Sequence, residues 1–383
     1  MAGRPRRKNA RVPKLVTLLD DADYLSQQLI TYLGNKRSLL QFIGTGLQRV
    51  LARLGKSKIA TFDVFSGSGV VARYFKRYSS NLLVNDLERY SQVINQCYLS
   101  NVSTINLPAL KDLHEQVVLD LASGPFAQGF IQELYAPRQD ASIQEGERVF
   151  YTSRNARYLD TARQRIQNVP REFQVYLLAP LLSQASIHAN TAGVFKGFYK
   201  NTDTGRGKFG GKQADALSRI LGDITLPFPI FSPFECDFRV YREDANVLCP
   251  QLDEVDLAYL DPPYNQHPYG SNYFMLNLLA DYRRPASISE VSGIPVDWNR
   301  STYNRRSHAH DSLARLVASI KAKFLMISFN SEGFIGQADM EHLLRRNGKL
   351  SVLETKYNTF RGSRNLSGRG LHVKEYLYLL EKS

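Results

Sequence analysis

The chain has 383 residues, 43% of them hydrophobic, which is enough for a large core and for more than one domain. No apolar stretch approaches the roughly 20 residues that a membrane helix needs. Three cysteines and seven histidines show no metal-ligand spacing, so we expect a cytoplasmic protein with reduced thiols and no metal. A net charge of +13 favours a nucleic-acid partner over a merely soluble basic protein, because phosphate neutralisation dominates such affinities.

The N-terminal residues 1–20 are interpreted as a disordered basic arm. The first fourteen, MAGRPRRKNARVPK, contain six bases and no acid. They lack the apolar stretch of a secretory signal.

Residues 21–108 are predicted to form the cofactor half of an α/β sheet domain. An apolar strand at 59–65 leads into Phe65-Ser66-Gly67-Ser68-Gly69, then a helix, then a strand at 82–84 that ends in Asn85-Asp86. The two glycines let a ligand approach the backbone, but neither GxGxxG nor a Walker lysine is present, which favours a nucleotide without a pyrophosphate. Asp86 is expected to accept from ribose hydroxyls, and Asp63 to orient loop amides or reach an ammonium group. An ordinary helix-start turn is the alternative.

Residues 109–235 differ in character and are predicted to be a mainly helical insertion. Helices are expected at 153–167 and 172–187, and a Gly/Lys-rich segment lies at 205–212. Lys196 and Lys200 alternate with aromatic residues. This pattern suits phosphate contact beside apolar packing or, nearly as well, an amphipathic surface helix.

Residues 236–383 are predicted to be the catalytic half of the same sheet. We expect strands at 244–248, 255–260, 324–329 and 376–380, and a helix at 338–346. Asp244 is the preferred acceptor for an adenine amino group, with small Ala245 admitting the ring. Asp237-Phe238 is its rival. The preference for Asp244 depends on its short sequence distance to Asp261, which suits adjacent strands.

The most informative motif is Asp261-Pro262-Pro263-Tyr264, at the end of the apolar run 255–260. A carboxylate, a carbonyl held rigid by two prolines and an aromatic ring would flank one small space at a strand's carboxyl end. Two acceptors and a stacking ring suit the exocyclic amine of a nucleobase. The alternative is a Pro-Pro turn closed by a surface tyrosine.

These motifs, in their order along the chain, resemble the D12 class of N6-adenine DNA methyltransferases, which includes Dam-like and restriction-modification enzymes. The resemblance covers most of residues 29–383 and also includes the stretch 32–36, Tyr-Leu-Gly-Asn-Lys. Stretches 189–194, 265–273 and 328–333 resemble a subset that accompanies restriction endonucleases. The resemblance to the D12 class implies a Rossmann-like S-adenosylmethionine-dependent methyltransferase sheet, split by an inserted DNA-recognition region.

The resemblance also implies roles for individual residues. The catalytic set is Asp261, Pro262, Pro263 and Tyr264, on which a flipped-out adenine would stack. The S-adenosylmethionine set is Tyr32, Gly34, Lys36, Asp63, Phe65, Gly67, Gly69, Asp86, Asp244 and Ala245. The local residue patterns, and not the resemblance, indicate the candidate substrate and DNA contacts: Tyr269, Asn272, Tyr273, Lys196, Lys200, Lys208, Lys212, Arg361 and Arg364, with aromatic core packing and solvated loops as alternatives.

The expected partner is double-stranded DNA, and a cognate restriction endonuclease would act separately. Three alternatives remain at this level. The first is the same chemistry on another substrate, namely RNA, protein glutamine or cytosine N4. The second is a catalytically inactive nucleic-acid-binding protein on the same fold. The third is a restriction subunit with nuclease activity. An intact acid and glycine pattern favours activity, and no nuclease triad is evident.

Overall fold

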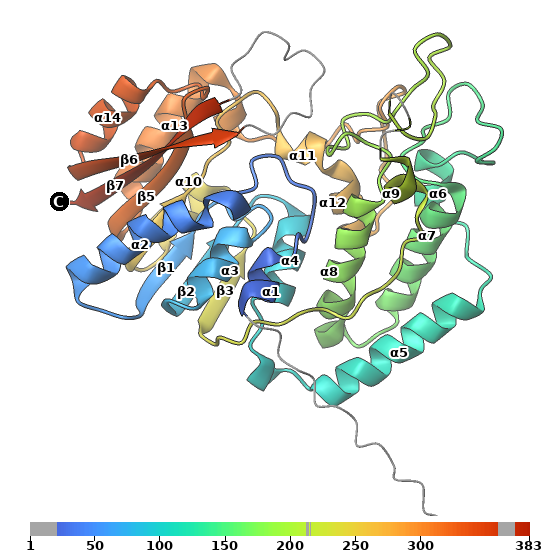
Figure 1. Cartoon of the computed structure of the whole chain (residues 1–383), viewed down its shortest axis with the longest axis horizontal. Helices are drawn as coiled ribbons and strands as arrows, with labels where there is room; N and C mark the ends of the chain where they lie inside the picture. The colour runs from blue at the N-terminus through green and yellow to red at the C-terminus, as the bar shows by residue number, and fades with distance from the viewer. Residues whose placement is uncertain (1–20, 212–213, 215, 359–371) are drawn as a thin grey trace, which may run out of the picture.

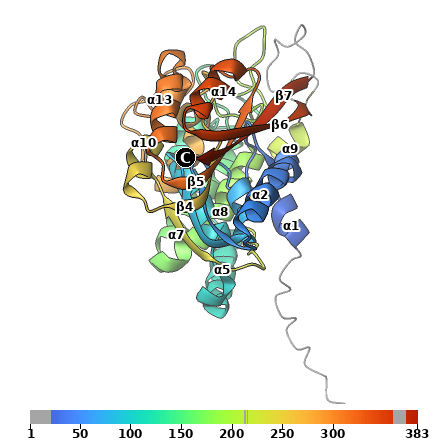
Figure 2. The same ribbon diagram turned by 90° about the vertical axis from the view of Figure 1, so that its left-hand side faces the viewer.

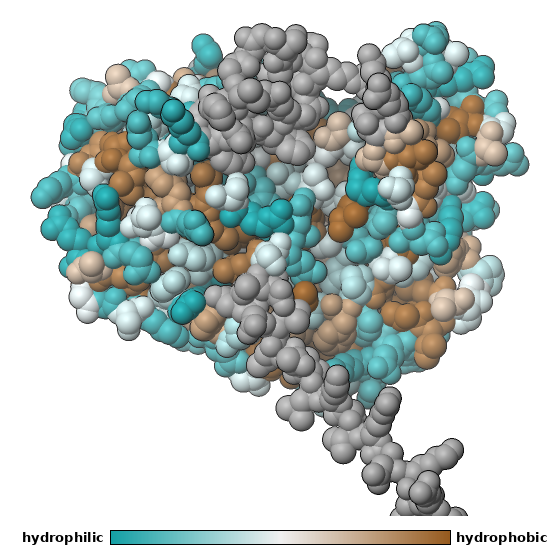
Figure 3. Space-filling model, viewed as in Figure 1, coloured by the Kyte–Doolittle hydropathy of each residue, from teal (hydrophilic) through white to brown (hydrophobic). Residues whose placement is uncertain are grey.

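The computed structural model describes residues 21–211, 214, 216–358 and 372–383. The predicted basic arm and the predicted contacts Lys212, Arg361 and Arg364 lie outside the described residues. In the described part no helix is both long and apolar enough to cross a bilayer. The hydropathy view shows apolar residues as separate patches among hydrophilic ones on the visible face (Figure 3).

One seven-stranded sheet with the order β3-β2-β1-β4-β5-β7-β6 organises the molecule (Figure 1). β7 runs antiparallel to both β5 and β6, whereas β1 to β5 pair in parallel. The strands are β1 Ile59–Asp63, β2 Ser79–Asn85, β3 Asp237–Tyr241, β4 Val255–Leu260, β5 Ala322–Asn330, β6 Gly348–Asn358 and β7 His372–Lys382. This arrangement confirms the predicted Rossmann-like α/β class.

Helices cover both faces of the sheet (Figure 2). Alternate residues of β4 show why: Leu257 and Tyr259 join a core with α2 and α3, while Ala258 and Leu260 join a core with α10, α13 and α14. The bounds of these helices are α2 Leu40–Leu54, α3 Val70–Lys76, α10 Ala245–Leu248, α13 Arg306–Ser319 and α14 Gln337–Arg345.

A third core joins the helices between α4 and β3 to the sheet domain through α4 and α12. These elements form the half of the molecule that lies away from β5–β7 in Figure 1. The remaining bounds are α1 Asp21–Ser26, η1 Arg37–Leu39, α4 Arg89–Tyr98, η2 Val102–Thr104, α5 Leu107–Ser123, α6 Phe130–Tyr135, α7 Ser153–Gln167, α8 Arg171–Ile187, α9 Leu217–Leu221, η4 Cys249–Gln251, α11 Tyr269–Asn272, α12 Phe274–Asp281 and η5 Thr302–Asn304.

Two sequence expectations about this region were wrong: that 244–248 forms a strand, and that this strand lies next to the one that ends before Asp261. Residues 245–248 form α10, whose first turn is capped by the Asp244 side chain accepting from Asn246 N. The strand is instead β3, and it lies at the sheet edge beside β2, three strands from β4. Apolar periodicity over four residues does not separate a short helix from a strand. The long edge strand β6 was also missed, because its described side chains are half-buried or exposed and so it lacks the buried apolar run of the central strands.

Candidate functional site at the carboxyl edge of the sheet

A pocket opens at the carboxyl ends of β1, β2 and β4, with about 860 Å³ of atom-free space including its mouth. Open α/β sheets place their ligands at this edge. Six acids line the pocket: Asp63, Asp86, Glu88, Glu243, Asp244 and Asp261. Among the described lining residues, Lys36 is the single base. A carboxylate-rich pocket in a chain of net charge +13 is suited to a cationic ligand.

The glycine turn after β1 brings backbone against this pocket. Gly67 and Gly69 have φ of 52° and 75°, in the left-handed region that favours glycine. A Cβ on Gly67 would lie 2.7 Å from the Tyr32 hydroxyl, and one on Gly69 would lie 2.7 Å from Asn95 Oδ1. Phe65 also lines the pocket, its ring edge-on to Tyr303 at 5.2 Å between centroids.

Tyr32 is held by two aromatic side chains from the segment after the proline motif. Its ring stacks on Tyr269 and on Tyr273, each at a centroid distance of 5.0 Å. The Tyr273 hydroxyl accepts from Leu33 N at 2.6 Å, and the Tyr269 hydroxyl donates to Leu33 O at 3.1 Å. The turn at 32–34 is thereby fixed over the glycine loop.

The structure separates the three predicted substrate residues in this segment. Tyr269 lines the pocket. Tyr273 is fully buried and Asn272 is 2% exposed, and the Asn272 carbonyl accepts from Phe195 N. Neither Asn272 nor Tyr273 lines the pocket, so for these two the alternative of core packing describes the geometry.

Asp86 links the two loops of the cofactor side. Its Oδ2 accepts from Gly67 N at 2.8 Å and its Oδ1 from Glu88 N at 2.9 Å. Burial raises the pKa of Asp86 to about 6, although the amides of Glu88, Gly67 and Leu87 oppose this shift.

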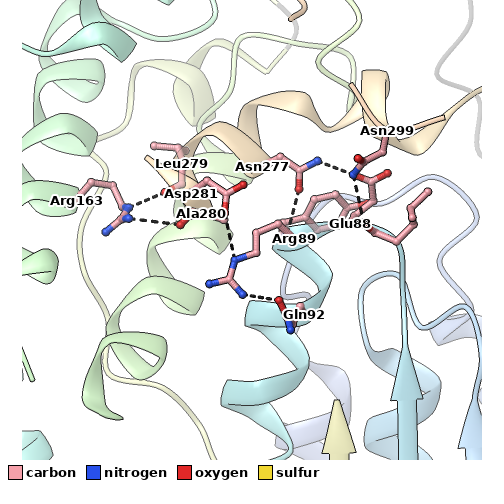
Figure 4. Close-up of polar contacts among 11 residues, drawn as sticks. Glu88, Arg89, Gln92, Arg163, Asn277, Leu279, Ala280, Asp281 and Asn299 are labelled. Carbon is pink, nitrogen blue, oxygen red and sulfur yellow. Dashed lines mark hydrogen bonds and ion pairs between the residues drawn. The ribbon is translucent and has the colours of Figure 1, made fainter. Parts of the chain in front are cut away.

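Glu88 is a pocket residue that sequence reasoning missed. Its Oε2 accepts from Asn277 Nδ2 at 2.5 Å and from Asn299 Nδ2 at 3.0 Å, which ties β2–α4 to α12 and to the loop after it (Figure 4). Burial, followed by the charge of Asp86, raises the pKa of Glu88 to about 7. Its position two residues after Asp86 was the available signal.

Asp63 is buried beneath the glycine loop. Neither carboxylate oxygen has a hydrogen-bond partner of good geometry among the described residues. Burial and then the charges of Asp261 and Asp86 raise its pKa well above the usual range, and the backbone amides of Ala72 and Phe65 offset part of the shift.

Asp244 and Ala245 line the pocket beyond the end of β3. The rival, Asp237, is exposed at the first residue of β3, opposite Asn81 near the start of β2, and so lies at the far edge of the sheet. Asp244 therefore reaches the pocket although β3 and β4 are not adjacent. The strand order β3-β2-β1-β4 brings Asp244 to the pocket, and the short sequence distance between Asp244 and Asp261 did not predict that order.

The proline motif follows β4 directly. Asp261 Oδ1 lies 3.1 Å from Lys36 Nζ, and Pro263 lines the pocket. The Tyr264 ring is edge-on to Phe329 at 5.7 Å, with Lys36 Nζ 5.6 Å from its centroid. Burial raises the pKa of Asp261 to about 6, against the opposing charge of Lys36. Lys36, expected to close over the cofactor, thus contacts the carboxylate that is predicted to be catalytic.

Five polar residues lie toward the pocket end of one face of the sheet: Asp63, Asp86, Asp261, Ser328 and Glu375. Each continues an alternating row whose apolar members face α2 and α3, such as Leu257 and Tyr259 before Asp261. Glu375 of β7 was not predicted. Its signal is a lone acid beside an otherwise apolar run at 376–380.

The predicted basic contacts that are described lie in an irregular loop. Lys196 is exposed, and Lys200 and Lys208 are half-buried. Residues 196–200 are not helical, which excludes the alternative of a surface helix there. Lys208 N donates to Tyr199 O at 3.0 Å, and Lys200 bridges to Gly207, so the loop folds back on itself.

The sheet order and the pocket at its carboxyl edge define an open, Rossmann-like α/β protein with a ligand site. Residues 32–291 match the model of the D12 class N6 adenine-specific DNA methyltransferase family. The chain belongs to this family.

Named relatives extend the match to nearly the whole chain. Type II methyltransferase M.NlaIII of Neisseria lactamica is 28% identical over 362 residues, which span 92% of this chain and 100% of the relative. Type II methyltransferase M.CviAII of Paramecium bursaria Chlorella virus 1 is 28% identical, over 92% of this chain and 98% of its own. Type II methyltransferase M.FokI of Planomicrobium okeanokoites is 25% identical, and the match covers 52% of its length.

Proposed function

We propose that this methyltransferase uses S-adenosylmethionine to methylate N6 of a flipped-out adenine within a specific duplex sequence. We further propose that it is the modification enzyme of a restriction-modification system. The observation that carries the cofactor assignment is the pocket with six acids and one base at the carboxyl edge of the sheet. The restriction-modification role is supported by two type II methyltransferases that match over 98–100% of their length.

The lining residues fit this cofactor chemically. S-adenosylmethionine carries a sulfonium and an ammonium against one carboxylate, so a net-negative pocket favours it. Asp63, whose buried oxygens lack a good partner, is assigned to the ammonium. Asp86 keeps lone pairs for the ribose hydroxyls beyond those bonded to Gly67 and Glu88. Asp244 and Ala245 are assigned to the adenine.

The chain's own residues would prepare the target amine. When bound, S-adenosylmethionine supplies the electrophilic methyl group. The Asp261 carboxylate and the Pro262 carbonyl accept the two N6 hydrogens, while Tyr264 stacks on the base. These acceptors counter delocalisation of the nitrogen lone pair into the ring, and their effect is greatest in the transition state.

Residues 109–235 are proposed as the DNA-recognition region. The loop with Lys196, Lys200 and Lys208 is tied to the segment after the proline motif, since Phe195 N donates to Asn272 O at 2.7 Å. Burial and then the charge of Lys196 lower the pKa of His267, which places Lys196 near the residues that follow Tyr264. Phosphate contacts from this loop would lie beside the site of base flipping.

The test is tritiated methyl transfer from S-adenosylmethionine to mixed-sequence duplex DNA, with nucleoside analysis of the product. Label in N6-methyladenine, lost in Asp261→Ala, is the expected result. A parallel reaction with RNA as the acceptor tests the RNA alternative, which label in RNA but not in DNA would favour. Cofactor binding without transfer to any nucleic acid would refute the proposal.

A further inference from the structure

The buried charges around Asp261 extend to a third residue. Lys36 Nζ lies 3.1 Å from Asp261 Oδ1 and also 3.1 Å from Glu375 Oε1. The exposed fractions of the Lys36, Asp261 and Glu375 side chains are 5%, 17% and 2%. The tetrapeptide is thus joined through one ammonium to the last strand of the sheet.

Fold stability does not account for an acid at this position of β7. The next members of the same row, Leu377 and Leu379, belong to the apolar core with α2. An apolar residue at 375 would continue that core, whereas a buried carboxylate loses its hydration and gains stability only from good partners. The ion-pair partner of Glu375 belongs to the site and not to the core, because Lys36 also contacts Asp261; the Ser328 hydroxyl donates to Glu375 Oε1 at 2.7 Å.

We propose that Glu375 is a positioning residue for methyl transfer, which holds the Lys36 ammonium against Asp261 and whose charge tunes how readily Asp261 accepts the substrate's amine hydrogens. This inference rests on the proposed function. The geometry that carries it is the shared ammonium. Asp261 Oδ1 and Glu375 Oε1 each lie 3.1 Å from Lys36 Nζ, so these two oxygens are no more than 6.2 Å apart.

Glu375 acts on Asp261 in two opposite ways. As an anchor, it keeps Lys36 in place, and Lys36 favours the ionised carboxylate. As a charge, it disfavours ionisation: burial and then Lys36 are the largest influences on the pKa of Asp261, and Glu375 raises it further. The other titratable groups near Asp261 are Asp63, Tyr259, Tyr264 and Tyr269.

Glu375→Gln separates the two effects, because the amide can still hydrogen-bond to Ser328 and lie against Lys36 while the charge is gone. Asp261 must be ionised to accept, so activity falls as the pH drops through its pKa. Without the Glu375 charge, the acid limb of the single-turnover methyl-transfer rate should move to lower pH. Coulomb's law at this separation gives a shift of about 0.5 to 2 pH units between water-like and protein-like screening.

Glu354→Gln is the matched control. Glu354 lies on the neighbouring strand β6, is 59% exposed and pairs with Lys374 at 3.3 Å. Its profile should coincide with that of the wild type, since an exposed pair is screened from the site.

Lys36→Gln tests the bridge from the other side. Loss of its positive charge should move the acid limb to higher pH, the opposite direction from Glu375→Gln. If Glu375→Gln does not fold, an unshifted Lys36→Gln profile would still overturn the proposal, because Glu375 is proposed to act on Asp261 through Lys36.

A folded Glu375→Gln enzyme with normal cofactor affinity and an unchanged acid limb would overturn the role of Glu375. An unshifted Lys36→Gln profile would do the same. A wild-type enzyme that transfers no methyl group to DNA at any pH would instead refute the proposed function, so the two failures are distinguishable.

Discussion

Gly67→Ala is the substitution whose effect the structure defines most closely. The new Cβ would lie 2.7–2.8 Å from the hydroxyl and ring carbons of Tyr32. The Tyr32 ring cannot withdraw easily, because it stacks at 5.0 Å on both Tyr269 and Tyr273. The turn must therefore move, and with it the Gly67 amide that bonds to Asp86.

The magnitude has two parts. An alanine at φ +52° costs about 1–2 kcal/mol relative to glycine. Overpacking against a fixed ring adds about 1–3 kcal/mol. If about 2 kcal/mol of this total is relieved by displacing the turn from the cofactor position, S-adenosylmethionine should bind about 30-fold more weakly.

Isothermal titration of S-adenosylmethionine measures this effect, with Gly55→Ala as the control. Gly55 has a φ of +64° at the end of α2, and no atom of the described residues lies within 4 Å of an added Cβ. The control should lose stability from backbone strain and keep its cofactor affinity. A Gly67→Ala protein that binds the cofactor as tightly as the control would refute the assignment of this turn.

Three further outcomes are expected. Asp261→Asn should lower the single-turnover rate about 10²–10³-fold and leave the cofactor Kd within a few-fold, and an equal loss in both would contradict the catalytic assignment. Cofactor binding should tighten from pH 5.5 to 8 as Asp86 (pKa about 6) and Glu88 (about 7) ionise. S-adenosylhomocysteine, which lacks the sulfonium charge, should respond less, and identical responses would rule out this electrostatic account. Lys196→Ala should reduce the salt slope of DNA affinity by about one unit. The control is Lys349→Ala, an exposed lysine at the end of the sheet away from the pocket, which should leave the slope unchanged. Equal slopes for the two variants would exclude Lys196 as a phosphate contact.

Local pattern predicted those elements whose signal is contained in a short stretch. The run at 255–260 is β4 to the residue, and the expected helix at 153–167 is α7. The strand has a continuous apolar run and the helix a long helical period. Burial in the folded protein favours the same structure as the local pattern in each case. At 245–248 the stretch was too short, and the capping Asp244 selected a helix.

The sequence by itself determined the family, the sheet class and the position of the acidic and proline motifs, because these depend on residue types at fixed local spacing. Tertiary structure alone decided which charges meet. Lys36, Asp261 and Glu375 are more than 100 residues apart from one another along the chain, and the order β4-β5-β7 brings the last two to one edge. Strand order depends on how whole faces pack, and that information is spread over the entire chain.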